Sequence, residues 1–423
     1  MKRIFIIIAA ALAISSSAAS ADTLLDEIAA TPGKAGGVYY AYPTESSQNT
    51  PAPKGYRPFY ISHYGRHGSR YLISDNDYRT VMERFRRADS LGVLTPLGHD
   101  VRLRLDSIWL EARGRGGELS PLGNRQHRAI ARRMGEAFPE VFAGDPRVSA
   151  SSTTVMRCAH SMFAFIEGLQ QLFPGLEVPR ESGERNMYFL NYHSPESGFY
   201  TSHEGPYYQT FKRFKAEKTN PDRLVASLFS DPDYVDMWID PVELMWQLYW
   251  VTVDMQNMET KITFDDIFTP EELYDLWQVF NFEFFARNSS YLPAEGRFTG
   301  NARNLVNDIL VNADEYIASG ENGATLRFGH DGNIIPLVAL LKLDGCYTDV
   351  YDPHELAGAW NDFRICPMGA NLQIVFFKNK AGDILVKFML NEREIALPIA
   401  TDSFPFYRWE DLRPYLQDIV AAD

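Results

Sequence analysis

The chain has 423 residues, of which 45% are hydrophobic and 23% are charged, and this balance excludes a disordered or low-complexity protein. The length predicts two or three domains with a large core. The formal net charge of −14 argues against broad nucleic-acid binding, which requires a basic surface. The three cysteines, Cys158, Cys346 and Cys366, are too few for a disulfide framework, although a bridge between the last two is chemically permitted outside the cytosol.

The first residues are typical of an export signal. Lys2 and Arg3 precede an apolar run at 4–14, and the small residues 19–21 fit a cleavage site. The apolar run is well short of the ~20 residues that a membrane-spanning helix needs. We therefore expect residues 1–21 to be a signal peptide, with no membrane span, and the protein to be periplasmic or secreted.

Three segments along the chain share one predicted layout, in which a strand is followed by a polar loop and a helix. The strands are expected at 59–64, 147–151 and 326–328, and their loops start at Arg66, near Thr153 and at His330. In an open α/β sheet such loops lie together beyond the carboxyl ends of the strands, where ligands bind. The helix N-termini there favour an anion.

Long helical segments rich in aromatic residues occupy 180–320. Asp240-Pro241 and Thr269-Pro270 are expected helix starts, and the aromatic sets Trp246/Tyr249/Trp250 and Trp277/Phe280/Phe284 fit helical core better than a ligand cage. Near the end, runs at 372–377 and 384–390 predict a hairpin. We expect an α/β fold with a mostly parallel central sheet flanked by helices. Residues 22–179 and 321–423 would form this α/β domain, and 180–320 a smaller, mainly helical insert.

Residues 66–70, Arg-His-Gly-Ser-Arg, are the most informative stretch. Like charge from Arg66 and Arg70 disfavours protonation of His67, which keeps a ring nitrogen free as a nucleophile near neutral pH. Arginines also offer planar pairs of donors that match phosphate oxygens, and Gly68 would let the backbone approach a ligand closely. A bare Arg-His-Gly is more often a surface turn, but the position directly after a strand favours the catalytic interpretation.

The other two loops contain candidate partners for His67. Arg157 lies in the first turn of a predicted helix, where a cation is unfavourable unless an anion lies nearby; a solvated surface arginine is the alternative. His330 would donate a hydrogen bond to phosphate and Asp331 would protonate a departing alkoxide, whereas the alternative is a turn in which Asp331 caps the next helix. The other histidines lack metal-site spacing, so we expect no metal and no cofactor.

Beyond these residues, the segments 117–142, 152–169, 328–330, 370–373 and 390–392 resemble the histidine acid phosphatases, and within them the multiple inositol polyphosphate phosphatase branch. The resemblance implies that His67 forms a phosphohistidine, that Asp331 is the proton donor, and that the phosphate is bound by Arg66, Arg70, Arg157 and His330. That branch usually has His-Ala-Glu where this chain has His330-Asp331-Gly332. Aspartate in the second position is instead the pattern of bacterial phytases and glucose-1-phosphatases, so we expect the acid to have moved by one position.

The resemblance implies an exported, metal-independent phosphomonoesterase that acts on inositol polyphosphates such as phytate. The alternative is a broad-specificity acid phosphatase or a sugar phosphatase; a phosphoglycerate-mutase-type phosphotransferase and a non-catalytic phospho-ligand binder are less favoured. The expected partner is an anionic phosphorylated small molecule, with no nucleic acid, and the protein is expected to be a monomer or homodimer. Basic residues of the helical insert that could contact substrate are Arg180, Arg185, Lys212, Arg213 and Lys215.

Overall fold

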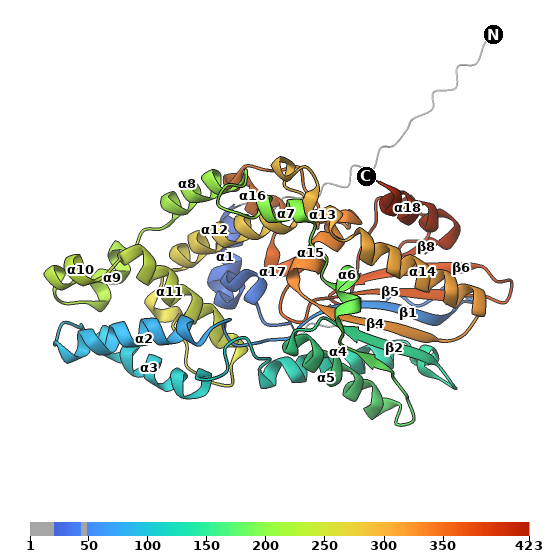
Figure 1. Ribbon diagram of the computed structural model, residues 1–423, viewed down its shortest axis with the longest axis horizontal. Coiled ribbons are helices and arrows are strands. Elements are labelled where there is room, and N and C mark those ends of the chain that lie inside the picture. Colours follow the sequence, from blue (N-terminus) through green and yellow to red (C-terminus); the bar gives the residue numbers. More distant parts are fainter. Residues whose placement is uncertain (1–20, 44–48, 423) are drawn as a thin grey trace, which may run out of the picture.

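The computed structural model describes residues 21–43 and 49–422 (Figure 1). Apart from residue 21, the expected signal peptide lies outside these residues. Within them, no helix combines the length and the hydropathy that crossing a bilayer requires. The three cysteines are buried free thiols, so the permitted bridge between Cys346 and Cys366 is not formed.

A mixed sheet of eight strands forms one half of the molecule (Figure 1). Its strand order is β3-β2-β4-β1-β5-β6-β7, and β8 pairs with β6. Strands β3, β2, β4 and β1 run parallel, whereas β5 is antiparallel to β1 and begins the predicted hairpin with β6. The strands are β1 (Arg57–Arg66), β2 (Arg147–Ser152), β3 (Arg180–Glu181), β4 (Gly323–Gly329), β5 (Asn371–Lys378), β6 (Ile384–Leu390), β7 (Arg393–Glu394) and β8 (Phe406–Arg408).

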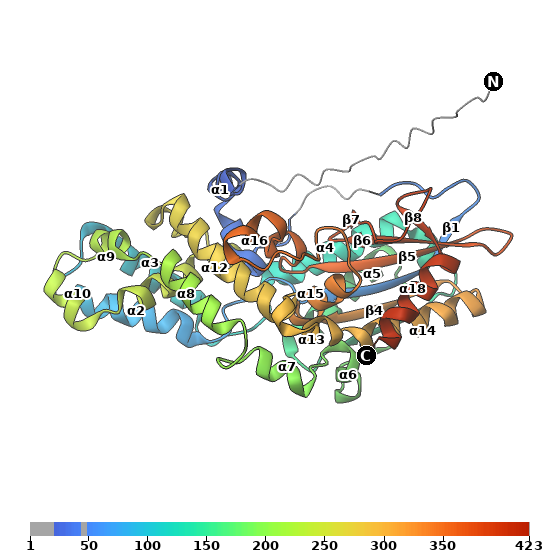
Figure 2. The same cartoon turned by 90° about the horizontal axis from the view of Figure 1, so that it is seen from above.

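Helices cover both faces of this sheet (Figures 1 and 2). The alternation of side chains along β5 explains why both faces need cover, because Leu372, Ile374 and Phe376 join one hydrophobic cluster and Val375 and Phe377 join the other. One face is packed by α4 (Pro121–Ala137) and α5 (Met156–Leu172). The other is packed by α6 (Met187–Leu190), α14 (Arg303–Ser319), α15 (Asp331–Leu340) and α18 (Trp409–Ala421).

The second half of the molecule is helical, and the predicted helix starts in it are confirmed. Asp240 accepts a hydrogen bond from Glu243 N at 2.9 Å, and Thr269 forms a capping box with Glu272. The helices are α1 (Ala21–Ala30), α2 (Asp75–Ser90), α3 (Pro96–Ala112), α7 (Pro195–Tyr200), α8 (Tyr208–Lys218), α9 (Asp222–Leu228), α10 (Pro232–Trp238), α11 (Pro241–Asp254), α12 (Pro270–Asn288), α13 (Arg297–Gly300), α16 (Pro353–Ala359) and α17 (Asp362–Ile365). Short 3-10 segments are η1 (Pro32–Tyr39), η2 (Pro139–Phe142), η3 (Glu184–Asn186), η4 (Met255–Asn257), η5 (Asp265–Ile267) and η6 (Leu292–Ala294).

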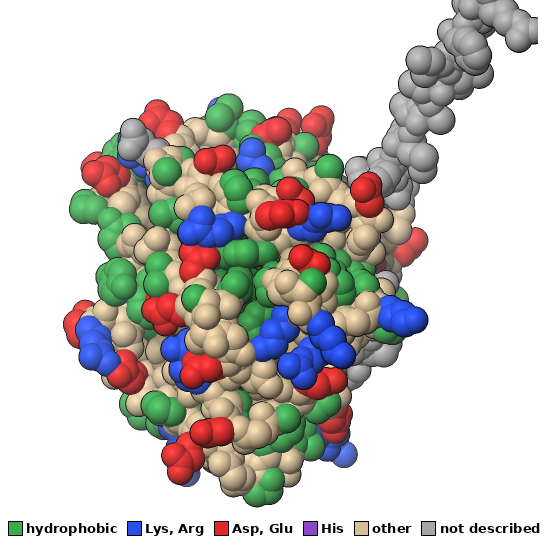
Figure 3. Space-filling model, turned by 90° about the vertical axis from the view of Figure 1, so that its right-hand side faces the viewer, with side chains coloured by type: hydrophobic (Ala, Val, Ile, Leu, Met, Phe, Trp, Pro, Cys, Tyr) green, Lys and Arg blue, Asp and Glu red, His purple; other side chains and the backbone are tan. Residues whose placement is uncertain are grey.

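The helical half includes residues outside 180–320, the range predicted for the helical insert. Helix α2 packs against α11, α1 packs against α12, and the segment η1 packs against both α11 and α12. Helix α14, in contrast, lies within 180–320 but packs beside the sheet. The domain boundaries stay a prediction. Figure 3 shows the end of the molecule that lies on the side of the sheet, away from the helical half. Acidic and basic side chains are interspersed there around hydrophobic ones.

Candidate active site

Three strands end side by side at one edge of the sheet. In the parallel pairing of β1 with β4, Arg66 lies opposite Gly329, and in the pairing of β2 with β4, Ser152 lies opposite Phe328. Residues 67, 153 and 330 therefore leave the sheet together. The strand register is what brings the three predicted loops to one place, at the carboxyl ends of the parallel strands.

A cavity of about 380 Å³ lies at this edge, and five of the six predicted site residues line it: His67, Arg70, Arg157, His330 and Asp331. The sixth, Arg66, is fully buried behind them. Its Nη2 donates to Asp331 Oδ2 at 2.7 Å, and its Nη1 donates to the carbonyl oxygens of Val38 and Cys366. Arg66 thus reaches the cavity through Asp331 rather than as part of the wall.

His67 has one ring nitrogen engaged and the other available. Its Nδ1 lies 2.9 Å from the carbonyl oxygen of Gly68, which can only accept, so Nδ1 carries the proton and Nε2 keeps its lone pair. Burial, and then the charges of Arg66, Arg157 and Arg70, hold the pKa of His67 well below its usual range. Both effects favour the neutral imidazole, in which Nε2 can act as a nucleophile.

Arg70 and Arg157 supply positive charge to the cavity without ion-pair partners among the described residues. Arg70 donates to Tyr39 Oη at 3.1 Å and to the carbonyl oxygen of Tyr71, and its guanidinium lies 4.7 Å from the centre of the Tyr39 ring. Arg157 is the second residue of α5, and burial, followed by the charge of Arg70, lowers its pKa. Asp331 lies on the same cavity, but no carboxylate of the described residues forms an ion pair with either guanidinium group. Together with the N-terminus of α5, at which Arg157 lies, the two guanidinium groups form a site for an anion.

His330 and Asp331 stand at the start of α15 beside His67. The His330 Nε2 lies 3.1 Å from Thr153 Oγ1, its ring centre lies 5.7 Å from that of His67, and burial lowers its pKa to about 4. For Asp331, burial raises the pKa, but the charges of Arg66 and His330 outweigh burial, so the pKa lies below the usual range for aspartate. The carboxylate also accepts a hydrogen bond from Gly332 N at 2.8 Å.

Gly68 has a packing role that was not predicted from the sequence. A Cβ added at this position would lie 2.7 Å from the Cα of Gly123 in α4. The Gly68 N–H donates to Ser161 Oγ of α5 at 3.1 Å. The glycine therefore lets the loop pack on the helices that cover the sheet, and the close approach of its backbone to a ligand stays a prediction.

One part of the cavity lining is an aromatic wall, which was not predicted from the sequence. Tyr39, Trp250, Phe280 and Phe284 line the cavity, with the Trp250–Phe280 and Phe280–Phe284 ring centres 4.8 and 4.7 Å apart. The expectation that these aromatic sets are core is correct for Trp246, Tyr249 and Trp277, which are buried. It also holds for Phe280, which is buried in the core and lines the cavity as well. It is incomplete for Trp250 and Phe284, which are only partly buried and line the cavity, because helical spacing alone does not distinguish core from cavity wall.

The basic residues proposed for substrate contact are not in the site. None of Arg180, Arg185, Lys212, Arg213 and Lys215 lines the catalytic cavity. Arg185 pairs with Glu181, and the Lys215 ammonium lies 4.3 Å from the centre of the Trp246 ring. The expectation is therefore wrong for the lining of the cavity that His67 faces.

Known proteins share this fold and part of this sequence. No family model matches the chain. Multiple inositol polyphosphate phosphatase 1 of Gallus gallus is 22% identical over 325 residues, covering 71% of this chain and 69% of that protein. A multiple inositol polyphosphate phosphatase of Bifidobacterium longum, solved in complex with phosphate, superposes with a TM-score of 0.71 at 20% identity, covering 92% of this chain and 98% of that chain. The phytase from D. castellii superposes with a TM-score of 0.68 at 16% identity, covering 92% and 85%.

These relatives share the arrangement described above, with a central sheet between helices and a helical half. The α/β fold with a central sheet flanked by helices is confirmed, although the sheet is mixed and not mostly parallel, because β5, β6, β7 and β8 pair antiparallel. The predicted resemblance to the histidine acid phosphatases, and within them to the multiple inositol polyphosphate phosphatases, is also confirmed.

Proposed function

We propose that the chain is a phosphomonoester hydrolase that acts on inositol phosphates through a phosphohistidine intermediate. One observation carries this proposal: a neutral imidazole faces two guanidinium groups that have no ion-pair partners among the described residues. Such a site is prepared for a phosphoryl group, whose oxygens match the paired donors of arginine. The phosphoryl group would lie between Arg70, Arg157 and His330, with its phosphorus in line with His67 Nε2.

The proposed reaction has two steps. In the first, the Nε2 lone pair forms a bond to phosphorus while the bond to the ester oxygen breaks, and protonated Asp331 gives its proton to the departing alkoxide. In the second, Asp331, now a carboxylate, takes a proton from water as the water oxygen attacks phosphorus. This step breaks the P–N bond and releases inorganic phosphate and neutral His67. The arginines stabilise the charge on the oxygens in both steps.

The choice of inositol phosphates rests on the relatives. The proteins that share the fold along most of the chain are inositol polyphosphate phosphatases and phytases. The proposal includes a metal-independent reaction, because the guanidinium groups supply the positive charge that a metal ion would otherwise provide. It also includes export, which depends on residues 1–21, and a monomeric or homodimeric protein.

Substitution of the nucleophile tests the proposal. His67→Ala should lower phosphate release from inositol phosphates by at least about 10³-fold, since no other group can form the intermediate. Release would be measured in the presence of a chelator, and folding would be checked by circular dichroism. His160→Ala, at an exposed position on α5, is the matched control and should keep wild-type activity. Near wild-type turnover by a folded His67→Ala protein would refute the mechanism.

A further inference from the structure

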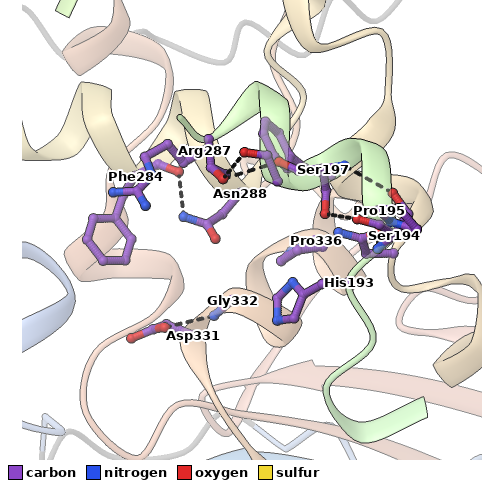
Figure 4. Close-up of a pocket in the computed structure, with 14 residues that line it drawn as sticks. His193, Ser194, Pro195, Ser197, Phe284, Arg287, Asn288, Asp331, Gly332 and Pro336 are labelled. Atoms are coloured by element: carbon purple, nitrogen blue, oxygen red, sulfur yellow. Dashed lines mark hydrogen bonds between the residues drawn. The ribbon is translucent and has the colours of Figure 1, made fainter. Parts of the chain in front are cut away.

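A second cavity adjoins the catalytic one on the side of Asp331. It has a volume of about 580 Å³, and the two cavities share Phe284 and Asp331 as wall residues (Figure 4). In the reaction proposed above, Asp331 protonates the ester oxygen. The alcohol part of the substrate must therefore lie next to Asp331 and away from His67, which places it against this second cavity and the aromatic wall.

Apart from Arg287 and Asp331, the polar groups that line the second cavity are uncharged groups that form hydrogen bonds. Its polar side chains, apart from Asp331, are His193, Ser194, Ser197, Thr201, Arg287, Asn288 and Asn301. Gly332 leaves the space open, because a Cβ there would lie 3.6 Å from Asn288 Oδ1 and 4.0 Å from His193 Cε1. Hydroxyl and amide groups of this kind match the hydroxyls of a polyol.

Little positive charge is left over for further phosphates. Arg287 is the one lysine or arginine among the described residues that line the second cavity, and it is paired with Glu283 at 2.9 Å. Burial lowers the pKa of His193, which favours its neutral form. In the catalytic cavity, Arg70 and Arg157 are engaged by the transferring phosphoryl group, and the carboxylate of Asp77 lies on the wall.

The aromatic wall also offers no positive charge to further phosphate groups of a substrate. The rings of Trp250, Phe280 and Phe284 offer apolar faces to the C–H faces of a ring or chain, and they cannot pair with a phosphate. Each phosphate group carries a charge of about −1.5 to −2 at pH 7. A hexakisphosphate would therefore bring about five more such groups to a lining that has no free cation among the described residues, and unpaired charges are costly to desolvate.

We infer that this site prefers polyol phosphates that carry one or two phosphate groups over fully phosphorylated inositol. The inference rests on the proposed function and narrows its substrate class. The phosphoryl end is held by the arginines, the polyol hydroxyls bind in the second cavity, and the ring face packs on the aromatic wall.

A substrate series with the wild-type protein tests this preference. The kcat/KM values for myo-inositol 1-phosphate, myo-inositol hexakisphosphate and p-nitrophenyl phosphate would be measured at one pH and one ionic strength. We expect kcat/KM for the monophosphate to exceed kcat/KM for the hexakisphosphate by about tenfold or more. A hexakisphosphate value equal to or above that of the monophosphate would overturn the preference while leaving the hydrolase intact. No hydrolysis of any of the three esters would instead remove the proposed function, and the preference with it.

A charge added to the second cavity provides a complementary measurement. Asn288→Lys should raise the ratio of hexakisphosphate to monophosphate kcat/KM by about three- to tenfold, because its ammonium group can pair with a distal phosphate. Asn307→Lys makes the same change at an exposed position on α14 and should leave the ratio unchanged. Equal ratios in the two variants would show that the rest of the substrate does not occupy this cavity. If Asn288→Lys does not fold, the substrate series with the wild-type protein still tests the preference for polyol phosphates that carry one or two phosphate groups.

Discussion

Asp331 is the residue whose protonation must differ most between the free protein and the proposed reaction. In the free protein Arg66 and His330 hold its pKa below the usual range, so it is a carboxylate over most of the pH scale. A bound phosphoryl group places negative charge beside it and takes up the positive charge of the arginines. Both changes raise the Asp331 pKa in the complex, so that substrate itself prepares the acid.

The rise of the Asp331 pKa on binding determines how turnover depends on pH. The alkaline fall of kcat, which reports loss of the Asp331 proton in the complex, should lie at higher pH than the alkaline fall of kcat/KM, which reports the free protein. In Asp331→Asn the fall of kcat should disappear, and kcat for inositol phosphates should drop by about 10²- to 10⁴-fold. The drop for p-nitrophenyl phosphate should be much smaller, because that leaving group needs no proton. Equal losses for both esters would remove Asp331 from the acid role.

Among the elements, η1 connects the helical half to the catalytic residues. The Val38 carbonyl accepts from Arg66, and the neighbouring Tyr39 hydroxyl accepts from Arg70. The segment is held by the buried carboxylate of Asp362, which accepts from Val38 N at 3.2 Å and from Trp277 Nε1 at 3.0 Å. Burial raises the pKa of Asp362 to about 7. Two of the catalytic arginines are therefore oriented by a segment far from them in sequence.

Gly37 allows η1 to take this path, and its substitution tests the role of the segment. Its φ is +54°, and a Cβ there would lie 2.2 Å from Asp362 Oδ2. Gly37→Ala should lose about 2–4 kcal/mol of unfolding free energy and also lose turnover, because Val38 and Tyr39 must shift. Gly144→Ala shares a positive φ, +79°, but has open space around it, and should lose about 1 kcal/mol with full turnover. Denaturant unfolding and phosphate release measure both effects; equal losses of stability with full activity in both variants would contradict this view of η1.

On the scale of the whole molecule, two buried histidines limit stability in acid. His63 and His127 lie between the sheet and α4 and α5, beside Phe165 and Phe328. Within the described part of the chain, the His63 ring nitrogens have no hydrogen-bond partner. Burial lowers the pKa of His63 to about 3 and that of His127 to about 4. Both are neutral in the folded protein at a pH at which the unfolded chain, with histidine pKa values of about 6.5, binds protons.

The free energy of unfolding therefore decreases as the pH falls. Stability from each neutral histidine is fully present above pH ~6.5 and is lost as the pH falls toward 4 and then 3, by about 1.4 kcal/mol per pH unit for each group. His63→Leu should make the loss of unfolding free energy between pH 6 and 4 less steep by about this amount. Denaturant unfolding at several pH values measures the slope, and the exposed His160→Leu is the control. An unchanged slope in His63→Leu would contradict the argument.

The sheet and the reacting residues could be predicted from the sequence, whereas most of the residues that form the walls of the site could not. The strand–loop–helix layouts at Arg66, Thr153 and His330 are local patterns in the sequence. Because parallel strands of one sheet end at the same edge, it could be predicted that the three loops lie close together. The contact of Arg66 with the Cys366 carbonyl joins residues 300 apart in sequence, which no local pattern encodes. Trp250 and Phe284 share the helical period of their buried neighbours, so only the packing of α11 and α12 shows which rings face the cavity.

The place of β1 in the sheet has a consequence for biosynthesis. Its two neighbours are β4, which begins at Gly323, and β5, which begins at Asn371, whereas β1 itself ends at Arg66. While the chain emerges from the ribosome, both edges of this apolar strand stay unpaired until β4 and β5 have been synthesised, a state that favours aggregation and creates a need for chaperones. A nascent chain that stops before Gly323 lacks His330 and Asp331, so hydrolysis requires synthesis to continue past both residues.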